Sequence, residues 1–216
     1  MVRGRRIIDV SVALTEGMPI YEGNPPFSVS WAMSKRRGDQ VNLTELREGV
    51  HTGTHVDAPY HFIEEGKKID ALPLTDFFVS AHVIECRGKT VGERVLSGKR
   101  IRKGEGVLFK TRNSAMYDMP FTRDFVYLEG GVAERLVELG VSVVGLDYLS
   151  VEAFGSHDAP VHNTLLSHNI PIIEGLCFKG VRAGKYTLAA FPLRLAGREA
   201  APARAVLFSP PLRDFS

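Results

Sequence analysis

The sequence predicts a single domain of the mixed α/β class. Eight segments show the apolar alternation or the short apolar runs of strands, whereas only two segments are expected to be helices. At residues 132–146 a helical pattern leads directly into a strand pattern, which is typical of half an α/β unit. No repeat, low-complexity tract or linker interrupts the 216 residues, so we place no domain boundary within residues 1–216.

Gly, Pro or charged residues bound each apolar segment. The expected strands are residues 6–13, 27–34, 41–48, 79–86, 106–111, 141–147, 185–191 and 204–208. Between the first two, residues 15–26 contain too much Gly and Pro for the interior of a strand or helix, so we expect a loop. Its apolar Met18, Ile20 and Tyr21 would suit either a pocket cover or a simple connection.

Two helices are expected. The first covers residues 132–139, whose apolar side chains share one face, and Gly140 supplies its stop signal. The second covers residues 158–168, with the Asp158 carboxylate as its cap and Pro160 in its first turn.

The overall composition excludes several classes of protein. Lys and Arg number 27 against 25 Asp and Glu, so the chain has no strong positive field for nucleic acid. No stretch approaches the roughly 20 apolar residues of a membrane helix, and a cytoplasmic protein is the default expectation. Cys86 and Cys177 lack metal-type spacing and are expected to be reduced thiols.

The histidines are unevenly distributed. His51, His55 and His61 fall within eleven residues, where even scattering of the seven histidines predicts about 0.4. In an extended chain these residues and Asp57 share one face, whereas a helix would turn Asp57 away. A straight strand would still separate His51 from His55 by about 13 Å, so we expect a bend at Gly53.

Two imidazoles and a carboxylate suit Zn²⁺, with Mn²⁺, Fe²⁺ or Co²⁺ as alternatives. Three protein ligands leave room for a water molecule, whose pKa the metal lowers to about 7, so that metal-bound hydroxide can attack an unreactive carbonyl. His61 is then a candidate general acid and base. The competing interpretation is a set of buried or surface histidines without a ligand role, which the alternating pattern beside Gly53 and Pro59 disfavours.

Residues 51–61, His-Thr-Gly-Thr-His-Val-Asp-Ala-Pro-Tyr-His, resemble the signature of the metal-dependent cyclase family, whose best-known enzymes are bacterial kynurenine formamidases. The resemblance continues at residues 9–19, 62–74, 144–151, 162–166 and 170–176 and so covers most of the chain.

This resemblance implies a swivelling β/β/α barrel with one or two metals per subunit, Zn²⁺ first and Mn²⁺ or another divalent ion as alternatives. It also implies a homodimer or higher homo-oligomer, in which the loop of residues 15–26 could reach a neighbour's pocket. By correspondence, the first metal is held by His51, His55 and Asp57, the second by Asp57, His162 and Glu174, and His61 is the base.

The two distant ligands are plausible from the residues as well. His162 falls in the first turns of the second helix, and Glu174 follows an apolar, strand-like run where a charge needs a partner. A metal ion, an arginine side chain or solvent could each be the partner of the Glu174 carboxylate. The remaining histidines, His82, His157 and His168, are interpreted as ordinary surface or core residues.

The sequence departs from the family pattern at Val79-Ser80, Cys177-Phe178-Lys179 and Glu199-Ala200-Ala201-Pro202. None of these positions is an expected ligand, so the departures bear on substrate identity rather than on metal chemistry.

The leading functional hypothesis is therefore a metal-dependent amidohydrolase that cleaves N-formylkynurenine, a small amide, to kynurenine and formate. One alternative keeps the site but opens a cyclic amide, imide or isatin-like lactam. Another is a non-catalytic protein that binds a metal or a small acid. Catalysis by a Cys or Ser nucleophile is disfavoured because no nucleophile elbow is present.

Overall fold

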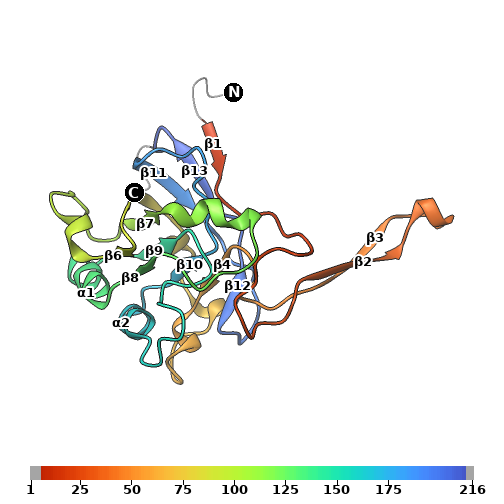
Figure 1. The fold of residues 1–216 in the computed structure, drawn as a ribbon, viewed down its shortest axis with the longest axis horizontal. Helices are drawn as coiled ribbons and strands as arrows, with labels where there is room; N and C mark the ends of the chain where they lie inside the picture. Colours follow the sequence, from red (N-terminus) through yellow and green to blue (C-terminus); the bar gives the residue numbers. More distant parts are fainter. Residues whose placement is uncertain (1–5, 213–216) are drawn as a thin grey trace.

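The structure is a computed structural model that describes residues 6–212 (Figure 1). Its body is one mixed sheet that curls into a half-barrel. The sheet contains β1 (Arg6–Asp9), β4 (His55–Asp57), β5 (Phe78–Glu85), β7 (Gly106–Lys110), β9 (Val143–Leu146), β10 (Ile172–Glu174), β11 (Gly184–Ala189), β12 (Ala200–Pro202) and β13 (Val206–Ser209). Their spatial order is β1-β13-β11-β5-β7-β9-β10-β4-β12.

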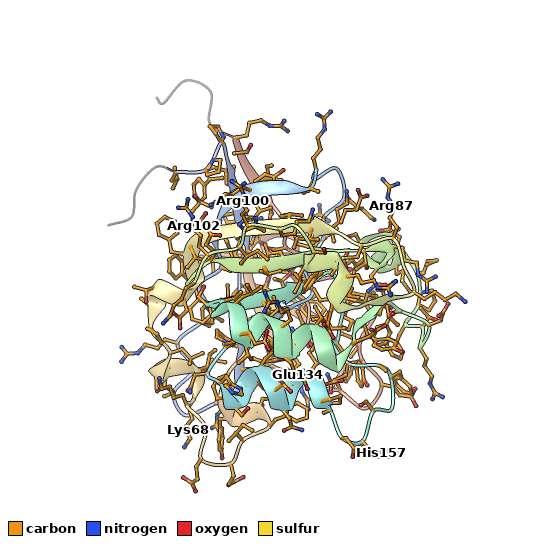
Figure 2. All side chains as sticks on the ribbon, turned by 90° about the vertical axis from the view of Figure 1, so that its left-hand side faces the viewer. Lys68, Arg87, Arg100, Arg102, Glu134 and His157 are labelled. Atoms are coloured by element: carbon orange, nitrogen blue, oxygen red, sulfur yellow. The ribbon has the colours of Figure 1, made fainter. Side chains whose placement is uncertain are left out.

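The four central strands β5, β7, β9 and β10 run parallel, and the flanking strands pair antiparallel. Apolar residues fill β7 and β9, as expected where both faces of a parallel strand are covered. Helices α1 (Gly130–Leu139) and α2 (Pro160–Ser167) lie side by side over one face, and Figure 2 shows them in front of the sheet.

The sheet separates two apolar cores. One joins α1 and α2 to the outer face through residues such as Leu136, Leu165 and Val144. The other fills the concave face with residues such as Val56, Leu108 and Leu207. Neighbouring positions on β7 and β9 therefore contribute to opposite cores, which fixes the register of the strands that carry the site.

Two small strand pairs lie outside the main sheet. The parallel strands β6 (Thr90–Val91) and β8 (Tyr127–Leu128) lie near α1, whereas β2 (Ser28–Met33) and β3 (Leu43–Arg47) form a hairpin that extends away from the body (Figure 1). No helix among residues 6–212 combines the length and apolarity needed to cross a membrane.

The structure confirms all eight expected strands and both helices, with ends shifted by a few residues. Gly53 has φ +64°, as the expected bend requires, and Gly140 ends α1 with φ +65°. Cys86 and Cys177 are free thiols.

The expected cap of the second helix is wrong. Ala159, not Asp158, occupies the position before α2 and makes no side-chain cap. The carboxylate of Glu152 instead accepts hydrogen bonds from the backbone N–H groups of Val161 and His162, at 2.7 and 2.9 Å. A residue ten positions away in the sequence thus replaces the local cap.

Candidate metal centre

Neighbouring elements bring the expected site residues together. His55 and Asp57 lie on β4, Glu174 ends β10, and His162 lies in the first turn of α2. The antiparallel register of β4 and β10 places Glu174 directly opposite His55. Opposite residues on paired strands have Cβ atoms about 4.5–5.5 Å apart, so the register itself juxtaposes these two side chains.

Asp57 lies at the centre of the cluster. Its Oδ1 is 2.9 Å from Nδ1 of His51 and 3.4 Å from Nε2 of His55. Its Oδ2 is 3.8 Å from Nε2 of His162. A carboxylate with histidines at both oxygens has the arrangement needed to bridge two cations.

Glu174 completes the second half of the cluster. One carboxylate oxygen is 3.5 Å from Nε2 of His55, and the other is 3.4 Å from Nε2 of His162. The structure therefore brings all five expected ligands to one place. Two compact groups among the described residues could each hold a metal ion: His55, Asp57 and Glu174 are all expected ligands, whereas the other group joins His51 and Asp57 to His61, the expected base.

The buried polar atoms of this cluster fit a cation. Among the described residues, Nε2 of His55 and both carboxylate oxygens of Asp57 are buried without a hydrogen-bond partner. The other nitrogen of His55, Nδ1, donates to the carbonyl oxygen of Gly53 at 3.0 Å, which directs Nε2 toward the carboxylates. Such a second hydrogen bond is the usual way in which proteins orient a metal-binding histidine.

The pKa shifts within the cluster also fit a cation site. Burial opposes the charged form of His55, but Asp57 and Glu174 outweigh it and raise its pKa to about 10. For Asp57, burial is outweighed by the neighbouring histidines, which hold its pKa well below the usual value. Without a metal, protonated histidine therefore neutralises the buried carboxylates.

His61 lies beside this cluster in the short 3₁₀ helix Pro59–His61. Its ring centroid is 4.2 Å from that of His51 and 5.8 Å from that of His162. Burial lowers the pKa of His61, so the ring is neutral near pH 7 and able to accept a proton.

A cavity of about 250 Å³ opens onto the cluster. His51, His61, His162 and Glu174 contribute to its wall. Phe62 stacks on the ring of His162 with centroids 4.4 Å apart, and it forms an apolar surface beside the polar atoms. The site thus combines an ion-binding floor with an aromatic wall.

The loop of residues 15–26 supplies part of the same wall through Tyr21 and Asn24. The ring of Tyr21 lies 5.6 Å from those of Phe121 and Phe154. The next residue, Glu22, forms a bidentate ion pair with Arg123. These contacts hold the loop over the cavity.

Two acidic residues of the site were not expected from the sequence. Glu152, which caps α2, has a carboxylate oxygen 3.4 Å from Nδ1 of His162. Glu199, one of the departures from the family pattern, lies 3.8 Å from Nε2 of His51. Neither belongs to a local motif, so only the assembled fold reveals them.

The three remaining histidines separate as follows. His82 hydrogen-bonds to Glu105 at 2.8 Å, and His168 contacts the carbonyl of Thr164, as expected for ordinary histidines. His157 differs, since it lines the cavity from the exposed loop before α2 (Figure 2).

Comparison with known proteins decides the family. The Cyclase family model matches residues 8–153 of the chain. The chain belongs to the Cyclase family. A curated relative from Salinibacter ruber named kynurenine formamidase is 36% identical over 213 residues, which are 95% of this chain and 98% of that protein. The resemblance first noted in residues 51–61 therefore extends over nearly the whole length.

Solved Cyclase-type structures share the fold. A structure titled as a "potential metal-dependent hydrolase with cyclase activity" is 32% identical, covers 94% of this chain and 98% of its own, and has a TM-score of 0.83. Isatin hydrolase A from Ralstonia solanacearum has the same TM-score at 20% identity and covers 94% of this chain and 92% of its own. At that identity the second likeness establishes the fold alone.

Proposed function

We propose that this Cyclase-family protein is a metal-dependent hydrolase of non-peptide C–N bonds that cleaves N-formylkynurenine to kynurenine and formate. The observation that carries the proposal is the cluster in which three histidines surround Asp57 and Glu174 contacts two of them, with His61 beside it. The kynurenine formamidase from Salinibacter ruber, 36% identical over 95% of this chain, supports this substrate.

The proposed ligand roles rest on the family resemblance, and the contacts of Asp57 with His51, His55 and His162 support them. His51, His55 and Asp57 would hold one divalent cation, and Asp57, His162 and Glu174 a second. The mixed nitrogen and oxygen donors suit Zn²⁺, with Mn²⁺ or another divalent ion as alternatives. A bound divalent cation polarises a carbonyl oxygen and lowers the pKa of a water molecule.

His61 is the proposed general acid and base. Its ring is neutral near pH 7 because burial lowers its pKa, so it accepts a proton from the attacking water. The same ring then returns that proton to the aniline nitrogen as the C–N bond breaks. Its position against His51 keeps the proton transfer beside the reacting carbonyl.

The aromatic wall would bind the aryl ring of the substrate. Phe62, stacked on His162, offers a flat apolar surface, and Tyr21 of the loop of residues 15–26 lines the same cavity. Aromatic side chains favour offset or edge-on contact with such a ring. The aryl ring would thus lie at the wall, with its formamide over the polar floor.

We further propose that residues 1–216 form one domain and that the protein acts in the cytoplasm as a homodimer or higher homo-oligomer. Its partner would be a small-molecule amide rather than nucleic acid or a membrane.

The decisive experiment measures formate release from N-formylkynurenine before and after complete metal removal. We expect activity to disappear with chelator and to return with Zn²⁺ or Mn²⁺. Unchanged activity after metal removal would refute the proposal. A protein that binds metal but releases no formate would instead support the non-catalytic alternative.

A parallel assay on isatin and a cyclic imide tests the ring-opening alternative. We expect the formyl amide to be the better substrate because two relatives, 36% and 31% identical over more than nine-tenths of this chain, are named kynurenine formamidase. Faster turnover of a cyclic substrate would indicate that the aromatic wall binds a lactam rather than an aryl formamide.

A further inference from the structure

The outer part of the cavity carries a side chain that the proposed reaction does not use. His157 lines the cavity from the loop before α2, and among the described residues its ring takes part in no hydrogen bond or ion pair. This side chain is exposed, whereas His162, five residues later, is only 4% exposed. Figure 2 shows His157 at the tip of its loop. The cavity wall therefore runs from the buried cluster outward to His157.

The loop that carries His157 is held by contacts with another part of the cavity wall. The ring of Phe154 lies 5.6 Å from that of Tyr21, and the backbone N–H of Gly155 donates a hydrogen bond to the hydroxyl oxygen of Tyr21. Tyr21 belongs to the loop of residues 15–26 and itself lines the cavity. The two loops therefore support each other, and His157 projects from a fixed turn.

The backbone between His157 and α2 has an unusual conformation. Ala159 has φ +38° and ψ +56°, in the left-handed region that residues with a Cβ seldom occupy. Its side chain is only 5% exposed and contributes to the cavity wall. Non-glycine residues stay in this region only where the surrounding structure fixes it, and such positions cluster at sites that clamp ligands. The conformation of Ala159 therefore supports a binding role for the turn that presents His157.

The polar groups of the wall differ between its two ends. Among the described residues the wall contains no lysine or arginine, and its two carboxylates, those of Glu152 and Glu174, lie at the buried end. A negatively charged group of a ligand would be repelled there. Toward the exposed end the wall offers the hydrogen-bond donors of Asn24, Ser156 and His157. The wall therefore favours an anionic group at its outer end.

We propose that His157, assisted by Ser156 and Asn24, binds the α-carboxylate of the substrate and thereby selects amino-acid formamides over plain aryl formamides. This inference rests on the proposed function, because N-formylkynurenine carries an amino-acid side chain on the aryl ring beside its formamide. With the formamide at the polar floor and the ring against Phe62, that side chain extends along the wall toward its outer end. There a ring N–H of His157 donates a hydrogen bond to the carboxylate, whose charge strengthens the bond.

The same contact would separate the formamide from the ring-opening alternative. Isatin and simple cyclic imides carry no carboxylate before the ring opens, so they gain nothing from His157 when they bind. A substrate with a carboxylate at a distance from the reacting amide uses both ends of the wall. Recognition of that carboxylate is therefore a source of selectivity that does not involve the proposed metal ligands or His61.

Three formanilides that share the reacting amide test the inference. The first is N-formylkynurenine, the second lacks its α-amino group but retains the carboxylate, and the third, ortho-acetylformanilide, lacks both groups. We expect the wild type to have a KM about tenfold lower for the two carboxylates than for the third compound, since hydrogen bonds to charged groups are the stronger ones. A similar KM for all three substrates would overturn the proposal.

Substitutions of His157 should act on KM and only for the carboxylate substrates. His157→Ala should raise that KM about tenfold with little change in kcat, because it removes a contact that substrate and transition state share. His157→Arg retains donors for a carboxylate and should keep the low KM, whereas His157→Glu should raise it further by repulsion. His168→Ala is the matched control, since His168 is an exposed histidine at the other end of α2. Equal losses on all three substrates, or no loss on any, would overturn the carboxylate role.

Calorimetric binding of kynurenine, which retains the carboxylate but has no formyl group to cleave, separates this contact from the reaction. We expect His157→Ala to raise the Kd for kynurenine about tenfold. Circular dichroism should show a wild-type fold, because the side chain is exposed. An unchanged Kd, or no binding by the wild type, would overturn the proposal. If the wild type released no formate from any formanilide while the Kd still depended on His157, the proposed function would fail and the carboxylate contact would stand.

Discussion

Individual side chains in the cluster have separable roles. His51, His55, His162 and the two carboxylates face one another within hydrogen-bonding or slightly longer distances, whereas the ring of His61 lies beside that of His51, tilted by 34°. Ligands and proton carrier can therefore be removed independently.

His61→Ala should lower turnover by about 10² to 10⁴ while metal content stays at the wild-type level, because the substitution removes proton transfer but no proposed ligand. Steady-state kinetics and elemental analysis measure the two quantities. His82→Ala is the matched control, since His82 pairs with Glu105 away from the site. Turnover near wild type in His61→Ala would show that another group moves the proton.

Metal binding should release protons at neutral pH. In the metal-free site the carboxylates raise the pKa of His55 to about 10, so its Nε2 is protonated at pH 7. A cation that takes this nitrogen must displace that proton. Calorimetric titration with Zn²⁺ in buffers of different ionisation enthalpy should show at least one proton released per site at pH 7. No buffer dependence would contradict this charge assignment.

Glu152 caps α2 and also lies beside the proposed ligand His162. Its carboxylate accepts from two N–H groups of α2 and lies near Nδ1 of His162. Glu152→Ala should lower the free energy of unfolding by about 1–3 kcal/mol, because buried N–H groups lose their acceptor. Glu152→Gln retains an acceptor oxygen and should remain close to wild type in urea unfolding. Equal losses in both variants would mean that charge, not capping, matters.

At the scale of the elements, two tight glycine turns bring the ligand strands together. Gly175 directly follows Glu174, has φ +72°, and a Cβ there would lie 1.9 Å from the backbone oxygen of Gly53. Gly53 is itself the bend between His51 and His55. The atoms nearest to a Cβ at Gly175 all belong to the backbone of Gly53 and Thr54, so they cannot move aside as a flexible side chain could.

Gly175→Ala should therefore destabilise the protein by more than about 3 kcal/mol, through the combined cost of the strained conformation and the backbone clash. Gly98→Ala is the matched control, because Gly98 has φ +70° but nothing within 4 Å of the added Cβ. Thermal unfolding compares them. Equal effects would show that the close approach adds nothing to the backbone strain.

The longer elements could be predicted from the sequence, and the short ones could not. Apolar alternation or a continuous apolar run over five to eight residues identified β5 and β7, whereas β10 and β12 have three residues each and no measurable period. The error at Asp158 has a similar origin, since capping rules consider adjacent residues and the acceptor here is Glu152.

At the scale of the whole molecule, the same distinction applies to the site. The spacing of residues 51–61 predicts the half of the cluster that is local in sequence, including the bend at Gly53. Glu174 meets His55 only because β10 pairs with β4, and residues give no sign of such a distant register. The residues left the partners of Glu174 and His162 open and family resemblance made these two residues expected ligands, whereas Glu152 and Glu199 required the fold.

The cluster connects β4, β10 and α2, so a cation bound to it should stabilise the whole fold. Binding contributes about 4 kcal/mol when free metal is a thousand times Kd. For a chain of this size each kcal/mol shifts Tm by roughly 2–4 °C. Removal of the metal should therefore lower Tm by roughly 8–16 °C in scanning calorimetry. An unchanged Tm would argue against a metal that joins these elements.

The pairing of β1 with β13 has a consequence for how the chain folds. Within residues 6–212, Arg6–Asp9 pairs in the sheet only with Val206–Ser209, about 200 residues later in the sequence. Because loop closure of this length must precede the pairing, the contact is of the kind that slows folding. During synthesis on a ribosome, β1 emerges long before its partner β13. The edge of the sheet that these two strands form can therefore be completed only after the body of the protein has been translated.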